Sequence, residues 1–113
     1  MNVEIKLIIL HLDLSDGSSG VLLENNEIIS HTLSNNNIDG VLRDVLFEYL
    51  ELRPEWVKFN LIDTLPTNSH ISIVYSCLIP AVINNKKGQW HSLGDINDKE
   101  IKRLVFQASQ RTA

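Results

Sequence analysis

The most regular hydrophobic pattern in the chain lies between residues 38 and 52. Apolar side chains recur there at the three- and four-residue spacing of a helix, at Ile38, Val41, Leu42, Val45, Leu46, Tyr49 and Leu50. This spacing predicts a helix with one buried face. The opposite face carries the charged residues Asp39, Arg43, Asp44, Glu48 and Glu51. Asn36, Asn37 or Asp39 is suited to cap the first turn, and Pro54 prevents continuation of the helix.

Shorter segments on both sides of this helix are rich in β-branched residues or alternate between apolar and polar residues, which predicts strands. The expected strands are 3–14, 21–24, 27–33, 56–65, 70–82 and 89–93. Strands 56–65 and 70–82 are expected to form a central hairpin, with Pro80 at an edge, bulge or end. A second helix is expected from Asn97, because Asn97 and Glu100 have the spacing of a capping box. Its predicted buried face consists of Ile101, Leu104, Val105 and Ala108.

The predicted element order is therefore β-β-β-α-β-β-β-α. A chain of 113 residues suits one domain, here residues 1–113, with one main core. Two amphipathic helices each need a surface to cover. A mixed sheet packed between them, an α/β/α sandwich of the α+β class, is the economical way to bury both apolar faces.

Composition narrows the functional classes. The net charge is −4, and the only basic pair is Lys86-Lys87, so nucleic-acid binding has little electrostatic support. Cys77 is the only cysteine, which excludes an internal disulfide, and its apolar surroundings predict a buried side chain. The apolar run at 3–14 is interrupted by charges and is too short to span a membrane. The N-terminus lacks a signal-peptide layout, so we expect a soluble cytoplasmic protein.

The charged face of the first helix holds the candidate chemistry. Asp44 and Glu48 are four residues apart and Glu51 follows three later, so the carboxylates share one stripe. Like charges at this spacing cost roughly 0.2–0.5 kcal/mol each unless they are neutralised. Mg²⁺ or Mn²⁺ would neutralise them, and so would Arg43 or solvent. Asp44, Glu48 and Glu51 are therefore the candidate metal ligands.

Four segments in this order resemble the landmarks of the Nudix hydrolase superfamily. Residues 17–23 are similar to its first hairpin, 42–48 to the core of its catalytic helix, 71–75 to its central strand and 89–96 to its late strand and turn. The resemblance covers nearly the whole chain. It implies the Nudix fold, a mixed sheet between two helices.

The family signature, G-x5-E-x7-R-E-U-x-E-E-x-G-U with U aliphatic, is only partly kept. Anchored at Arg43, it places Asp44 at the first Glu of the helix and Glu48 at the last. Phe47 replaces the Glu between them, and Leu50 replaces the Gly. Upstream, Ile29 and Asn35 stand where the signature has Gly and Glu.

The family holds Mg²⁺ with these carboxylates against a diphosphate, so the losses favour a degenerate, non-catalytic protein that binds a nucleotide-type ligand or a protein partner. The first alternative is a divergent Mg²⁺- or Mn²⁺-dependent hydrolase that cleaves a nucleoside diphosphate linked to another group, with Arg43, Asp44 and Glu48 as catalytic residues. The second alternative is a small α+β interaction module that uses the hairpin around 56–82 for a partner or a homodimer.

Aromatic and imidazole side chains supply further candidates. Trp90 and Tyr75 are candidates for stacking on a nucleobase, with packing in the core as the competing role. The histidines are scattered and lack metal-ligand spacing, which indicates ordinary strand residues; they are His11, His31, His70 and His91.

Overall fold

The computed structural model describes residues 2–12, 17–33, 37–51, 55–79 and 85–111. Its elements in chain order are β1 (Asn2–Leu12), β2 (Ser19–Glu24), β3 (Glu27–Thr32), α1 (Ile38–Leu50), β4 (Asn60–Pro66), β5 (His70–Ile79), β6 (Gln89–Ser92), a 3-10 turn η1 (Leu93–Asp95) and α2 (Lys99–Arg111). The predicted order of strands and helices is confirmed.

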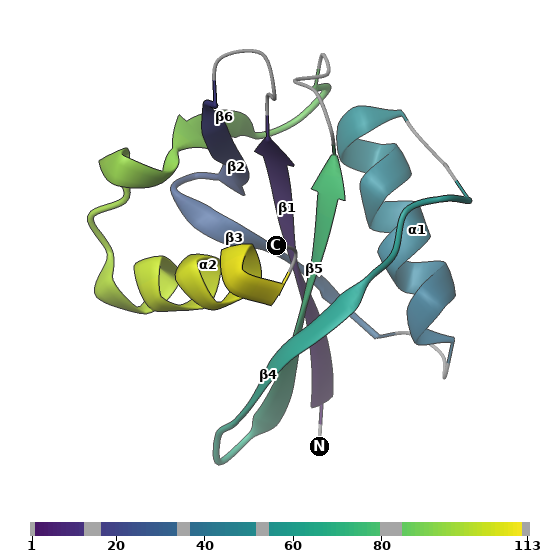
Figure 1. The fold of residues 1–113 in the computed structure, drawn as a ribbon. Coiled ribbons are helices and arrows are strands. Elements are labelled where there is room, and N and C mark those ends of the chain that lie inside the picture. Colours follow the sequence, from purple (N-terminus) through teal and green to yellow (C-terminus); the bar gives the residue numbers. More distant parts are fainter. Residues whose placement is uncertain (1, 13–16, 34–36, 52–54, 80–84, 112–113) are drawn as a thin grey trace.

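Within these residues, six strands form one mixed sheet in the order β4-β5-β1-β3-β2-β6. The long strand β1 organises it. Its first half pairs with β3 and its second half with β2, both antiparallel. Along its other edge, β1 runs parallel to β5 from the Asn2–His70 pair to the His11–Ile79 pair. Figure 1 shows β1 and β5 side by side in the same direction, with β4 at the outside of the sheet.

The two helices lie on opposite faces of this sheet (Figure 1). Successive side chains of a strand point to opposite faces, so β1 contributes to two cores. Ile5, Leu7 and Ile9 pack under α1, whereas Ile8 and Leu10 pack under α2. Both helices bury the faces predicted from their spacing. The α/β/α arrangement is therefore confirmed.

The largest difference from the sequence prediction lies between α1 and β4. A strand was expected from residue 56, but Glu55 and Trp56 form a turn and β4 begins at Asn60. Val57 is buried and Phe59 packs against the α1-side core, so their alternation reflects packing beside the helix. Pro54 lies outside the described residues.

Other boundaries shift by one to three residues. β2 begins at Ser19, two residues early, because Leu12 and Ser19 still pair as neighbours in the ladder. β3 ends at Thr32 and β6 at Ser92, one residue early in each case. β1 and β5 end at Leu12 and Ile79; positions 13–14 and 80–82, including Pro80, lie outside the described residues.

Helix α2 begins differently from the predicted capping box. The Asp98 carboxylate, and not Asn97, accepts the first-turn hydrogen bonds, from the Glu100 and Ile101 amides at 2.9 and 3.0 Å. Asp98 therefore occupies the N-cap position, and the helix starts at Lys99. None of the described helices is long and apolar enough to cross a membrane.

Candidate functional site

The start of α1 is held by side chains of its first two turns. Asn37 caps the helix by accepting the Gly40 amide at 3.0 Å. The guanidinium of Arg43 donates to Asp39 at 3.0 Å, to the Val57 carbonyl at 3.4 Å, and lies 5.2 Å from the centre of the Phe59 ring. Arg43 thus joins α1 to the segment that leads into β4.

The end of α1 meets a pair of lysines from the segment before β6. Glu51 closes the helix in the left-handed conformation, with φ of 55°. Lys86 Nζ lies 2.6 Å from Glu51 Oε1, and Lys87 Nζ lies 3.6 Å from Glu48 Oε2. The Lys86 amide also donates to the Tyr49 carbonyl at 2.7 Å, which fixes the lysine segment against the last turn. We call these four side chains the lysine–carboxylate cluster.

Tyr49 connects this cluster to the sheet. Its side chain is buried in the core, and its hydroxyl donates to Glu24 Oε1 at 2.5 Å. Lys87 Nζ lies 5.9 Å from the centre of the Tyr49 ring. Burial, the hydrogen bond to Glu24 and the nearby negative charges of Glu24 and Glu48 all raise the pKa of the Tyr49 hydroxyl. The phenol is therefore a neutral donor to a carboxylate.

A recess of about 460 Å³ opens beside the cluster. It is lined by Glu24, Asn25, Asn26, Lys87, Gly88 and Gln89. Asn25 and Asn26 have φ of 52° and 63°, the left-handed pair that a tight two-residue hairpin turn requires. Gly88 has φ of 77°, and a Cβ there would lie 2.8 Å from the Leu23 carbonyl oxygen, so this position needs glycine. The recess thus has built walls and one ammonium group at its edge.

The predicted α1 site residues divide into two groups. Asp44, Phe47 and Glu48 are exposed along one side of the helix, whereas Arg43 is half-buried and turned toward Val57 and Phe59. Phe47, which stands in place of a signature glutamate, is 44 % exposed. The helix therefore presents a phenyl ring beside its two remaining signature carboxylates.

A divalent cation does not fit this arrangement as it stands. Among the described residues, no group of three or more His, Cys, Asp or Glu side chains could hold a metal ion. Glu48 and Glu51 instead face the ammonium groups of Lys87 and Lys86. The assignment of Asp44, Glu48 and Glu51 as metal ligands stays a prediction.

The two aromatic candidates lie on the α1 side of the sheet. Tyr75 and Trp90 are half-buried and pack against the α1-side core, and neither lines the recess beside Lys87. The Trp90 ring meets the His11 ring edge to face, with centroids 4.9 Å apart. Their role in stacking on a base stays a prediction.

The four histidines and Cys77 are parts of strands. All four histidines lie in strands, as expected: His11 in β1, His31 in β3, His70 in β5 and His91 in β6. Cys77 is fully buried in β5, and burial raises the pKa of its thiol to about 12.

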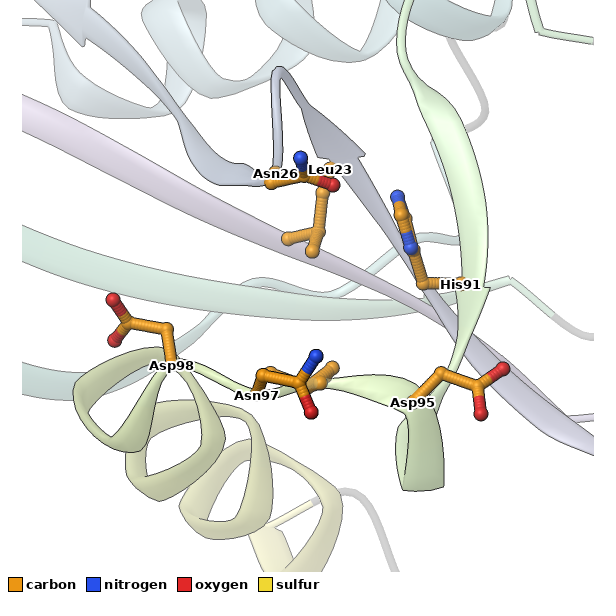
Figure 2. A pocket seen from close by; sticks show the side chains of 7 residues that line it. Leu23, Asn26, His91, Asp95, Asn97 and Asp98 are labelled. Atoms are coloured by element: carbon orange, nitrogen blue, oxygen red, sulfur yellow. The ribbon is translucent and has the colours of Figure 1, made fainter.

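A second cavity, of about 260 Å³, was missed by sequence reasoning and lies on the α2 side. Figure 2 shows its walls, formed by the β2–β3 turn, β6 and the segment that leads into α2. The only sequence signal was the group of polar residues Asp95, Asn97 and Asp98 next to a predicted helix start. Cavities of this kind depend on three segments meeting in space.

No protein-family model matches the sequence, and a search of curated proteins finds no match either. Solved structures do match. The Nudix domain of Shewanella oneidensis NrtR in complex with ADP ribose aligns with 98 % of this chain and 88 % of its own, with a TM-score of 0.70 and 13 % identity. The Caenorhabditis elegans Ap4A hydrolase aligns with 100 % and 99 %, with a TM-score of 0.68 and 13 % identity.

A third similar structure is the C-terminal domain of mouse MUTYH in complex with human PCNA. It aligns with 99 % of this chain and 90 % of its own, with a TM-score of 0.71 and 13 % identity. The strand order, the helix on each face and these alignments together define a Nudix-fold protein. At such low identity the likeness concerns the fold, and the site must be argued from this chain's own residues.

Proposed function

We propose that this chain is a Nudix-fold binding protein that holds a nucleotide-type ligand without hydrolysing it. The observation that carries the proposal is the lysine–carboxylate cluster. Two carboxylates at the end of α1 are neutralised by Lys86 and Lys87, which belong to the protein itself. Exposed ion pairs of this kind contribute little to stability. They matter for the proposal because they place positive charge next to the carboxylates of α1.

Catalysis of diphosphate cleavage makes a demand that this helix does not meet. Charge that develops on the phosphate oxygens needs a cation or fixed donors in the transition state. Phe47 offers an apolar ring where the signature has a carboxylate, and Glu48 already faces Lys87. A bound diphosphate would therefore meet the ammonium group of Lys87, beside the Glu24 carboxylate that accepts from Tyr49, without the metal that activates water.

The recess beside Lys87 provides the binding surface. Lys87 supplies one positive charge for a phosphate, while the carboxamides of Asn25, Asn26 and Gln89 supply hydrogen-bond donors and acceptors for ribose or base. A volume of about 460 Å³ lies within the usual range for small-ligand sites. The similar Nudix domain bound to ADP ribose motivates the choice of ligand class.

The test is a titration with ADP-ribose, with and without Mg²⁺, followed by thermal shift and by chromatography of the nucleotide. We expect a rise in melting temperature in both conditions and an unchanged nucleotide after overnight incubation. Lys87→Gln should weaken binding, whereas Lys102→Gln, on an exposed lysine of α2, should leave it unchanged.

Two outcomes would overturn this proposal. Mg²⁺-dependent turnover that disappears in Glu48→Gln would establish the divergent hydrolase, with Arg43, Asp44 and Glu48 as its catalytic residues. The absence of binding by ADP-ribose, dinucleoside polyphosphates and NTPs would reject the nucleotide-type ligand.

A protein partner is the second candidate, because one large apolar side chain of α1 and one in the turn after it are exposed. Phe47 is 44 % exposed and Trp56, in the turn after α1, is 61 % exposed. The similar MUTYH domain is itself in complex with a protein. If the partner is a second copy of the chain, light scattering should give twice the chain mass of 12.8 kDa. The Trp56→Ser variant should give the mass of one chain. If the unmodified chain keeps the mass of a monomer up to millimolar concentration, the homodimer is excluded.

A further inference from the structure

We infer that the cavity on the α2 side of the sheet is a second binding site, which takes a small ligand with an apolar body and a cationic head. The α2 helix packs on the face opposite α1, and none of the four side chains of the lysine–carboxylate cluster lines this cavity, although Asn26 lines both it and the recess beside Lys87. The inference does not depend on the proposed nucleotide binding, and its ligand has the opposite charge.

The cavity combines an apolar floor with a polar rim. Leu23 and Ile96 are buried members of the α2-side core and form its apolar part. The rim consists of Asn26, His91, Asp95, Asn97 and Asp98. Figure 2 shows Leu23 and Asn26 on one side of a central space and Asn97 on the other, with His91 and Asp98 at opposite ends of it. The Asp95 carboxylate stands at the outer rim and points away from this space in the view. Apolar lining with a few convergent polar groups is the usual composition of a small-ligand site.

The charge of the rim determines the sign of the ligand. Two carboxylates line the cavity, and its lining contains neither Lys nor Arg. Asp98 is committed to capping α2, through hydrogen bonds from the Glu100 and Ile101 amides. Asp95 has no hydrogen bond or ion pair with any residue that the structure describes. Asp95 is therefore the carboxylate available to an ammonium or amidinium group, which donates to carboxylates in strong charge-assisted hydrogen bonds.

His91 forms the β6 wall of the cavity and carries a ring nitrogen without a partner among the described residues. Its Nε2 is buried and makes no hydrogen bond within the described residues. A buried polar atom without a partner costs roughly 1–3 kcal/mol, and native proteins usually satisfy such atoms. Figure 2 shows the imidazole extending from β6 along the wall of the cavity toward the β2–β3 turn. A ligand that fills the cavity would lie against the accessible part of this ring, so the His91 signals report on its occupancy.

Size limits the ligand further. A volume of about 260 Å³ is below the range for drug-sized molecules, which begins at about 300 Å³. One ring with one charged group fits this space. Benzamidine, a planar apolar ring with an amidinium head, is a suitable probe, and benzamide and benzoate are its neutral and anionic counterparts of nearly equal shape.

The experiment is an NMR titration of the isotope-labelled chain with these three probes. We expect benzamidine to shift the signals of Leu23, His91 and Ile96 in a saturable manner, benzamide to do so more weakly and benzoate not at all. Asp95→Asn should weaken benzamidine binding by about tenfold, because it removes the charge and keeps the shape. Glu55→Gln, an exposed carboxylate in the turn after α1, is the matched control and should have no effect.

Three results would overturn the inference. They are equal shifts with benzoate, unchanged affinity in Asp95→Asn, and the absence of saturable shifts at millimolar benzamidine. Asp98→Asn removes the second charge of the rim but keeps an oxygen that can cap α2. It therefore tests whether Asp98 affects benzamidine affinity through its charge or through the stability of the helix. The signals of residues 87–89 report on nucleotide binding at the other recess, so failure of one site is distinguishable from failure of the other.

Discussion

The Tyr49 hydroxyl donates to Glu24 Oε1 at 2.5 Å and so joins the last turn of α1 to the end of β2. Both groups approach the α1-side core, where the Tyr49 ring is 4 % exposed. The bond fixes the end of the helix relative to the β2–β3 turn. It thereby sets the distance between the lysine–carboxylate cluster and the recess beside it.

We expect Tyr49→Phe to lower the free energy of unfolding by about 1–2 kcal/mol. The variant keeps the ring in the core but removes the donor to a partly buried carboxylate. Urea denaturation followed by circular dichroism measures the change. Tyr75→Phe, which alters a half-buried tyrosine of the same core, is the control. Equal stability of Tyr49→Phe and the unmodified chain would mean that the bond contributes nothing.

The raised pKa of the Tyr49 hydroxyl leads to a prediction about stability at alkaline pH. Its pKa is raised in the folded state by burial first and then by Glu24 and Glu48, relative to the ordinary value of 10.0. A raised pKa means that folding favours the protonated phenol, so its contribution is complete below pH 10 and is lost as the pH rises above 10. Between pH 9 and 11 the unmodified chain should lose more stability than Tyr49→Phe. Parallel losses in the two proteins would contradict this linkage.

Much of the fold could be predicted because the helices and strands have regular apolar periods. The residues of α1 that the spacing assigned to its buried face are buried from Val41 to Leu50. Only the pairing of distant strands, such as β1 with β5, has no local signal, since it depends on contacts about 70 residues apart. The segment from Val57 to Phe59 misled the prediction because an apolar alternation fits packing beside a helix as well as a ladder.

The candidate site was predictable on α1 itself and not beyond it. Arg43, Asp44 and Glu48 could be placed on one helix from the sequence. That Lys86 and Lys87 would face Glu51 and Glu48 could not, because the two segments are separated by β4 and β5. The cavity near Asp95 likewise depends on a turn, a strand and a helix start that are distant in sequence.

The start of α2 gives a test that separates the sequence prediction from the structure. Asp98→Ala should destabilise the chain by about 1 kcal/mol, because it removes the acceptor of the Glu100 and Ile101 amides. Asn97→Ala should change stability by less than about 0.5 kcal/mol, as expected for an exposed residue outside the cap. Thermal or urea unfolding of both variants decides the matter. A larger loss for Asn97→Ala would restore the capping box predicted from the sequence.

Cys77 should resist alkylation in the folded protein. Its thiol is fully buried in β5, and its pKa of about 12 leaves almost no thiolate, the reactive form, near neutral pH. Mass spectrometry after iodoacetamide treatment should find the chain unmodified in buffer and modified once in urea. Rapid modification in buffer would show that β5 opens readily from its place between β1 and β4.

The lysine–carboxylate cluster leads to a prediction about metal affinity. If Lys86 and Lys87 provide the positive charge at the end of α1, then the Lys86→Met/Lys87→Met double variant leaves Glu51 and Glu48 without these counter-ions. Removing one charge about 4 Å away in water changes an interaction by about 1 kcal/mol, so Mn²⁺ affinity should rise by roughly five- to tenfold. Electron paramagnetic resonance of free Mn²⁺ measures this. Lys102→Met, which removes an exposed lysine of α2, should leave Mn²⁺ affinity unchanged, and adding Glu48→Gln to the double variant should abolish the gain. Unchanged affinity in the double variant would mean that the lysines do not take the place of a cation.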